Sequence, residues 1–151
     1  MEDCVVCAAL RSPESSRDIW IHDDDLVLLA HVPPSGEAAS DAYPGHLLLV
    51  PRRHVESPGA LTSAEAERIG LWLSRGSGLL ESTLGAPHVY LARLGDGWPH
   101  LHVHILPRYP GTPERYRGLE VRDWPGVTRC DRVTAAAIAE QLRRALSPLH
   151  S

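Results

Sequence analysis

The sequence predicts an α+β domain, an antiparallel sheet of about five strands with two helices. Five short apolar runs are bounded by Pro, Gly or Asp, which is typical of strands. Two longer segments carry apolar residues at helical spacing. The chain has 151 residues, 43% hydrophobic and 23% charged. This size and composition fit one domain over residues 1–151 that can bury a core of its own.

The first two strands are predicted to form a hairpin. Residues 18–22 read Asp-Ile-Trp-Ile-His, an alternating strand pattern, and a polar turn leads to a second strand over 26–32. Residues 33–44 are rich in Pro, Gly, Ser and Ala and predict a surface loop. A short buried strand follows over 46–50, and Pro51 ends it.

The central helix is expected to begin after Thr62, because Thr62-Ser63-Ala64-Glu65 has the pattern of a capping box. It should end near Thr83, with Gly85 as its C-terminal cap. Its apolar residues lie near one face. They are Ala66, Ile69, Leu73, Leu80 and Leu84.

A fourth strand is predicted over residues 88–94, and a tight connection over 94–99 leads to a last strand antiparallel to it. The chain from 108 to 128 is rich in Pro and Gly and is expected to be mostly irregular. Asp131 can cap a C-terminal helix. Its apolar residues at helical spacing are Ile138, Leu142 and Ala145.

The last predicted strand carries three histidines, His100, His102 and His104, in the run His-Leu-His-Val-His-Ile. Side chains two residues apart share a face of a strand, so three imidazoles stand in a row. Leu101, Val103 and Ile105 then point toward the core. Groups that titrate near neutrality on so apolar a strand indicate chemistry. The alternative is a His-rich face that is solvated or poised for a metal.

The overall charge limits the partners. The net charge of −4 offers no broad basic surface, so a nucleic acid is not expected, although a local Arg/His cluster could hold a compact anion. No run approaches the ~18 apolar residues that a membrane span needs. The acidic start lacks a signal-peptide pattern, and three cysteines do not suit a secreted disulfide framework. A cytoplasmic location with reduced thiols is expected.

Two motifs resemble the histidine triad (HIT) family of nucleotide hydrolases and transferases, in particular its zinc-containing bacterial type. Residues 44–54 read Pro-Gly-His-Leu-Leu-Leu-Val-Pro-Arg-Arg-His, and residues 100–108 read His-Leu-His-Val-His-Ile-Leu-Pro-Arg. They come in the family's order, with a helix between them. The resemblance covers about residues 4–108 and implies a HIT-like fold. Residues 109–151 add an irregular segment and the C-terminal helix.

The resemblance implies a nucleotidyl hydrolase that cleaves at the α-phosphate of purine nucleotide derivatives, either dinucleoside polyphosphates or nucleoside phosphoramidates. His102 is then the nucleophile that forms a nucleotidyl-histidine intermediate. Because only a neutral imidazole attacks, one ring nitrogen must donate to a fixed acceptor, such as a backbone carbonyl on a neighbouring strand or loop. His104 would donate to the phosphate or leaving group, and His46 and His100 complete the catalytic set. Arg108 is either a phosphate contact or a surface residue.

Cys4 and Cys7 form a C-x-x-C pair that alone fits a redox pair, a zinc half-site or chance. Similarity to zinc-containing bacterial HIT proteins and to galactose-1-phosphate uridylyltransferases implies Zn²⁺ held by Cys4, Cys7, His54 and His100. Four such ligands leave no open position, so the zinc is expected to be structural, with no catalytic metal required. The alternative is a pair of buried reduced cysteines. Cys130 is expected to be an ordinary thiol.

The chain departs from the family pattern at two places. Many members carry an Asp for the ribose at the end of the second strand, where this chain has Ala30 and His31. The loop before the triad is often polar, whereas here it reads Gly-Asp-Gly-Trp-Pro over residues 95–99. Trp98 is therefore expected to cover the pocket or to stack on a base as part of the substrate site.

Two other functions stay open. One is a nucleotidyltransferase or phosphorylase that uses a phosphate acceptor, and the other is a non-catalytic protein that binds nucleotide or zinc. Members of the family commonly pair through the central helix and a neighbouring strand, so a homodimer is expected. Trp72 on that helix belongs either to this interface or to the core.

Overall fold

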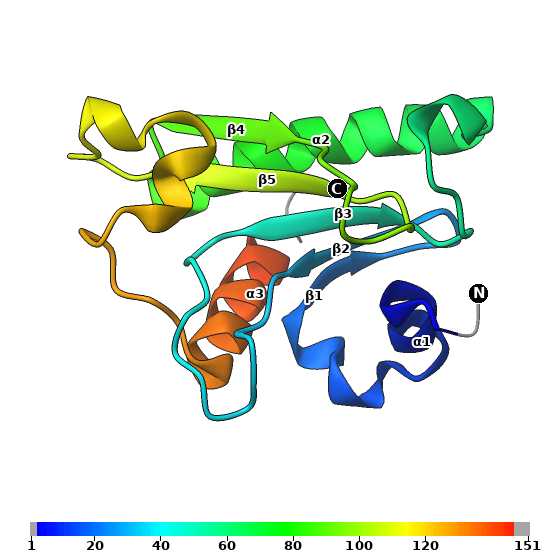
Figure 1. The fold of residues 1–151 in the computed structure, drawn as a ribbon, viewed down its shortest axis with the longest axis horizontal. Helices are drawn as coiled ribbons and strands as arrows, with labels where there is room; N and C mark the ends of the chain where they lie inside the picture. The colour runs from blue at the N-terminus through cyan, green and yellow to red at the C-terminus, as the bar shows by residue number, and fades with distance from the viewer. Residues whose placement is uncertain (1–2, 147–151) are drawn as a thin grey trace.

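The structure is a computed structural model that describes residues 3–146, so both ends of the predicted domain, residues 1–2 and 147–151, lie outside it. In the described part, five strands form one antiparallel sheet in the order β1-β2-β3-β5-β4 (Figure 1). The α+β class and the five-stranded sheet are confirmed. The strands are β1 (Trp20–Asp23), β2 (Val27–His31), β3 (Leu47–Pro51), β4 (His88–Ala92) and β5 (Val103–Arg108).

Among residues 3–146 there are three α-helices: α1 (Val5–Arg11), α2 (Ser63–Leu84) and α3 (Arg132–Leu146). The predicted helices α2 and α3 are confirmed, and Asp131 caps α3 by accepting from the Thr134 amide. The short helix α1 was not predicted. Its N-cap is the Cys4 thiol, a weak acceptor that gives no ordinary capping signal. α1 lies beside the β1 end of the sheet (Figure 1).

The capping box at the start of α2 is confirmed. The Thr62 hydroxyl accepts from the Glu65 amide at 3.2 Å, and the Thr62 amide donates to the Glu65 carboxylate at 2.8 Å. Arg53 also donates two hydrogen bonds of 2.8 Å to this buried carboxylate. Glu65 therefore ties the loop that carries His54 to the start of the central helix. Gly85 ends the helix in the left-handed conformation, with φ at +69°.

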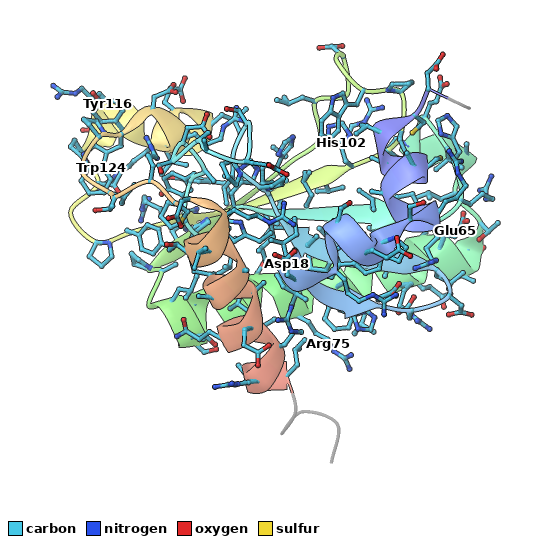
Figure 2. All side chains as sticks on the ribbon, turned by 90° about the horizontal axis from the view of Figure 1, so that it is seen from below. Asp18, Glu65, Arg75, His102, Tyr116 and Trp124 are labelled. Carbon is cyan, nitrogen blue, oxygen red and sulfur yellow. The ribbon has the colours of Figure 1, made fainter. Side chains whose placement is uncertain are left out.

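The two faces of the sheet have different tasks. On β3, Leu47 and Leu49 are buried in the main core with Trp72 of α2, whereas Leu48 between them lines a surface pocket. This alternation is the ordinary period of a strand. His102 lies on the side of the sheet where α1 is found (Figure 2). One face is thus packed against the central helix, and the opposite face is partly buried in a second hydrophobic cluster and partly open to the pocket.

The histidine run enters the sheet later than the alternation predicts. β5 begins at Val103 rather than at His100, and Val103 is only half-buried. The pairing of β5 with β3 begins at Val103, opposite Leu49, and Leu101 instead donates to the Val55 carbonyl at 2.7 Å. His100 and Leu101 are nevertheless buried, with 1% and 2% exposure. The start of the triad is therefore an inward-packed loop.

The segment between β5 and α3 follows a defined path that contains two short 3₁₀ helices, over Glu114–Tyr116 and Gly118–Asp123. Val121 is fully buried in a small cluster with Tyr43 and Leu106. This packing holds the segment against the 33–44 side of the sheet.

None of the helices in the described part is long and apolar enough to cross a membrane.

Candidate active site and metal centre

His102 is held by a hydrogen bond that decides its tautomer. Its Nδ1 lies 2.8 Å from the backbone carbonyl oxygen of His100, and a carbonyl only accepts, so Nδ1 carries the proton. In the neutral ring, the lone pair is then on Nε2. A fixed backbone carbonyl on a strand or loop is the acceptor expected from the sequence, and it comes from the loop residue two positions earlier. The ring is 6% exposed and lines a pocket.

His46 and His104 form a second unit in the same pocket. Their Nε2 and Nδ1 atoms lie 2.8 Å apart, so one ring donates to the other. Burial is the main cause that lowers the pKa of His46 to about 3 and that of His104 to about 4. Neighbouring histidines and the Arg122 guanidinium lower both values further. Both imidazoles are therefore neutral near pH 7, which keeps a proton available to be passed between them.

The turn before His46 depends on Gly45. Its φ is +79°, and a Cβ at this position would lie 2.9 Å from each of three side-chain atoms, on Leu84, Pro107 and Tyr109. The Gly45 amide donates to His31 Nε2 at 2.9 Å, and His31 Nδ1 donates to the Val32 carbonyl at 2.7 Å. His31 thus positions the turn that presents His46, and no local sequence pattern indicates this role.

A pocket of about 460 Å³ is lined by His46, His102 and His104. Leu48, Arg122 and the loop over residues 94–98 complete its walls. Trp98 covers one side, with its ring 5.3 Å from that of His102, and remains 44% exposed. An apolar cavity of about 150 Å³ adjoins this pocket and shares Trp98 and Leu48 with it. The pocket therefore offers a polar floor beside an apolar recess.

Two arginines lie differently with respect to this pocket. Arg108 does not line the pocket, and its guanidinium donates instead to the Tyr90 hydroxyl at 3.2 Å. Arg122 does line it, but it comes from the segment that was expected to be irregular and belongs to neither motif. Nothing in the local sequence distinguishes Arg122 from its neighbours, so only the fold could identify it.

Cys4, Cys7, His54 and His100 come together as the sequence reasoning expected. One ligand atom from each residue lies within 4.8 Å of the others. The Cys7 sulfur is 3.4 Å from His54 Nδ1 and 3.5 Å from His100 Nδ1, and the Cys4 sulfur is 3.5 Å from His100 Nδ1. A tetrahedral zinc with ordinary bond lengths sets its N and S ligands about 3.6 Å apart. This cluster can therefore hold a metal ion.

The surrounding groups fit the same interpretation. His100 Nε2 donates to the Pro51 carbonyl at 2.7 Å, so its Nδ1 lone pair is directed at the sulfurs. His54 Nε2 lies 3.8 Å from a Glu56 carboxylate oxygen. Burial and the adjacent Cys4 raise the pKa of the Cys7 thiol, so two thiolates side by side need a cation. The donor set favours a borderline-soft ion such as Zn²⁺.

Comparison with known proteins gives one family and one curated relative. Residues 12–111 match the HIT domain family. The chain is 28% identical over 109 residues to adenosine 5'-monophosphoramidase HINT3 of Xenopus tropicalis. That alignment covers 68% of this chain and 66% of the relative, slightly less than two thirds of its length. The family match begins after Cys4 and Cys7, so it covers the histidines and not the cysteine pair.

Solved structures share the fold at low sequence identity. A Hit-like protein from Bartonella henselae, described as involved in cell-cycle regulation, superposes with a TM-score of 0.72 at 16% identity, covering 97% of this chain and 98% of that one. A Zn-bound histidine triad family protein from Mycobacterium smegmatis superposes with a TM-score of 0.69 at 18% identity, covering 99% and 96%.

Proposed function

The chain belongs to the HIT domain family, and from this membership and the pocket we propose that it is a nucleotidyl hydrolase acting at the α-phosphate of purine nucleotide derivatives. The observation that carries the proposal is the hydrogen bond from His102 Nδ1 to the His100 carbonyl. In the neutral ring it places the Nε2 lone pair in a pocket that His102 shares with His46 and His104. A neutral, oriented imidazole is the state a histidine nucleophile needs.

The reaction follows from this arrangement in two displacements. The His102 Nε2 lone pair attacks the α-phosphorus, the bond from phosphorus to the leaving group breaks, and the leaving group departs with that electron pair. A proton from water passes along the His46–His104 hydrogen bond to an amine leaving group, and the water that attacks in the second step gives a proton back along it. Water then attacks the phosphorus, the P–N bond to His102 breaks, and a nucleoside monophosphate is released. The His100 carbonyl stabilises the charge that His102 carries between the two steps.

The apolar cavity is the proposed site for the purine. Its walls include Ile19, Leu28 and Trp98, and it opens beside the histidines. An apolar recess next to a few polar groups is the usual form of a small-molecule site. Trp98 can stack on the base and also close the pocket over the phosphate. Ala30 and His31 offer no carboxylate to the ribose, so recognition rests on the base and the phosphates.

We propose that Cys4, Cys7, His54 and His100 hold a structural zinc ion. Two thiolates and two imidazoles close its coordination, so the ion would contribute stability and fix the chain around His100. Elemental analysis of freshly purified protein should find about one zinc per chain. Protein that folds and turns over substrate without any bound metal would rule the site out.

We also propose a homodimer through α2 and β4. β4 is an edge strand, and Leu91 on it and Leu71 on α2 are 50% and 42% exposed. Trp72 is 1% exposed and belongs to the core, so it does not contribute to this surface. A charge on an edge strand opposes pairing, so Leu91→Asp should halve the mass seen by light scattering. A wild-type mass equal to one chain would contradict the dimer.

The experiment is a measurement of nucleoside monophosphate release by wild-type protein and the His102→Ala variant. The substrates are diadenosine polyphosphates, an adenosine phosphoramidate and their guanosine counterparts. The diadenosine polyphosphates have a charged leaving group, and the adenosine phosphoramidate matches the activity in the name of the curated relative. His88→Ala is the control, because His88 is an exposed histidine on β4 that does not line the pocket.

The expected result is release by wild-type and His88→Ala protein and none above background in His102→Ala protein. Trapped wild-type protein should also gain the mass of one nucleotidyl group. Turnover in His102→Ala protein would refute the nucleophile. Nucleoside diphosphate formed only when phosphate is added would identify a phosphorylase. Tight nucleotide binding without turnover would identify a binding protein.

A further inference from the structure

Arg122 lies where the histidine pocket meets a third, polar cavity. It lines the histidine pocket, and it also lines a polar cavity of about 260 Å³ that contains Ser35, Asp41 and Tyr43. His46 and Val32 are shared by the same two cavities. The guanidinium lies close enough to His46 and His104 to lower the pKa of each. A fixed positive charge therefore borders the reactive histidines.

The backbone at Arg122 is anchored on both sides. Val121 is fully buried beside Tyr43 and Leu106. The Arg129 guanidinium donates to the Arg122 carbonyl at 2.5 Å and to the Trp124 carbonyl at 2.9 Å. The short helix that carries Arg122 is therefore held in place by contacts that do not use the Arg122 side chain. Such anchoring lowers the entropic cost of placing a long side chain in a site.

The Arg122 side chain has no internal partner. The nearby Arg129 guanidinium is fixed by hydrogen bonds to two backbone carbonyls. The Arg122 guanidinium, in contrast, makes no hydrogen bond or ion pair within residues 3–146. It is half-buried, so part of its hydration is already lost. A half-buried arginine with five unused donors is suited to binding an oxyanion from solution.

The order of the cavities assigns that oxyanion a position. The histidine pocket shares Trp98 and Leu48 with the apolar cavity on one side, and His46 and Arg122 with the polar cavity on the other. If the base occupies the apolar cavity, the α-phosphate lies over His102. Attacking and leaving atoms of a phosphoryl transfer are roughly in line, so the group beyond the α-phosphate departs toward Arg122 and the polar cavity.

Building on the proposed hydrolase function, we propose that Arg122 is a specificity-determining residue that binds the phosphate group beyond the α-phosphate. When His102 forms its bond to the α-phosphorus, the P–O bond to the bridging oxygen breaks and the leaving phosphate keeps the electron pair. The guanidinium stabilises the negative charge that develops there. A phosphoramidate releases an amine and gains nothing from this contact. Arg122 therefore selects phosphoanhydrides over phosphoramidates.

The test compares two substrates that share adenosine and the α-phosphate: diadenosine triphosphate, which releases a charged leaving group, and adenosine 5'-phosphoramidate, which does not. The kcat/KM ratio of the first over the second is measured for wild type, Arg122→Gln and Arg122→Lys. Arg117→Gln is the matched control, because Arg117 belongs to the same segment but is exposed and does not line either cavity. Circular dichroism and thermal unfolding check that each variant folds.

The ratio should fall about tenfold to a hundredfold in Arg122→Gln, the range expected for losing hydrogen bonds to a charged group. Arg122→Lys should fall less, and Arg117→Gln should match wild type. A folded Arg122→Gln protein whose ratio equals that of wild type would overturn the proposal while leaving the hydrolase intact. Wild-type protein that releases product from neither substrate would overturn the hydrolase as well.

A third arm separates a leaving phosphate from a free phosphate acceptor. The phosphoramidate is incubated with inorganic phosphate, and nucleoside diphosphate formation is measured. The proposal expects wild-type protein to give the monophosphate as its product. Diphosphate formation that Arg122→Gln abolishes, with the substrate ratio unchanged, would assign Arg122 to an acceptor site and refute the leaving-group role.

Discussion

His100 and His102 are two residues apart, yet their rings are fixed in opposite tautomers. His100 donates from Nε2 to the Pro51 carbonyl, which leaves Nδ1 directed at the sulfurs of Cys4 and Cys7. His102 donates from Nδ1 to the His100 carbonyl, which leaves Nε2 directed to the pocket. The comparison shows that the backbone acceptor decides which ring nitrogen of a histidine is left to face other groups.

The two clusters also differ in how they are closed. The cluster of Cys4, Cys7, His54 and His100 has a complete tetrahedral donor set within 4.8 Å. His46, His102 and His104 instead surround a pocket of about 460 Å³. A closed donor set stabilises the fold, and an open one leaves room for a reactant. Variants of His102, Cys4 and His46 should each damage one cluster and spare the other, and Cys130→Ala should spare both.

The largest expected effect separates activity from metal binding. His102→Ala should lower kcat by on the order of 10⁴-fold or more, because it removes a reacting atom. It should keep about one zinc per chain, since none of the four ligands changes. Product release and elemental analysis of the same preparation measure both. Loss of the metal together with activity would show that the two clusters form one unit.

The converse variant is Cys4→Ser. Serine keeps an oxygen acceptor for the Cys7 amide at the start of α1, so the helix cap survives while the soft ligand is lost. Removing a residue that only hydrogen-bonds to a ligand lowers metal affinity by roughly 10–100-fold, and removing a direct ligand should lower it more. The lost binding energy should lower the Tm of the variant by at least about 5 °C. Thermal unfolding with and without a chelator tests this. A chelator that lowers the Tm of Cys4→Ser as much as that of wild type would refute the metal site.

Acid should weaken the His46–His104 pair before it weakens most of the fold. Both pKa values are lowered by folding from 6.5, to about 3 and about 4, so their contribution is complete above about pH 6.5 and is lost as pH falls. Linkage gives about 2.5 kcal/mol for His46 alone between about pH 7 and about pH 4.5. Urea unfolding should show a smaller drop for His46→Gln than for wild type. If the free energy of unfolding fell equally with pH in the two proteins, this role of the His46–His104 pair would be contradicted.

The smallest effect is expected at Cys130, the third thiol. It is 1% exposed, packs with Ala42 and Ala135, and lies in neither cluster. Cys130→Ala should lower the free energy of unfolding by about 1 kcal/mol, as for a small cavity, and leave both zinc content and turnover unchanged. Denaturant unfolding provides the comparison with Cys4→Ser. A metal loss in Cys130→Ala protein would mean that the donor set has been misassigned.

Local patterns predicted the parts of the fold that local chemistry decides. The capping box at Thr62 and Glu65 and the separation of His46 from the triad were readable, because their partners are near in sequence or on adjacent strands. Arg108 was a weaker inference for a geometric reason. It lies six positions after His102, and an extended chain rises ~3.3 Å per residue, so the two Cα atoms are about 20 Å apart. Arg122 and α1 depend on tertiary packing and a thiol cap, which have no sequence signature.

The double hydrogen bond from Arg53 to Glu65 has a consequence for how this protein opens. The same carboxylate closes the first turn of α2 and holds the loop that ends at His54. The first turn of α2 cannot open while this loop stays closed, and the loop cannot open while the turn stays closed. The start of the longest helix and the loop of one metal-ligand candidate therefore belong to one cooperative unit, whose amide protons exchange with solvent together and not in sequence.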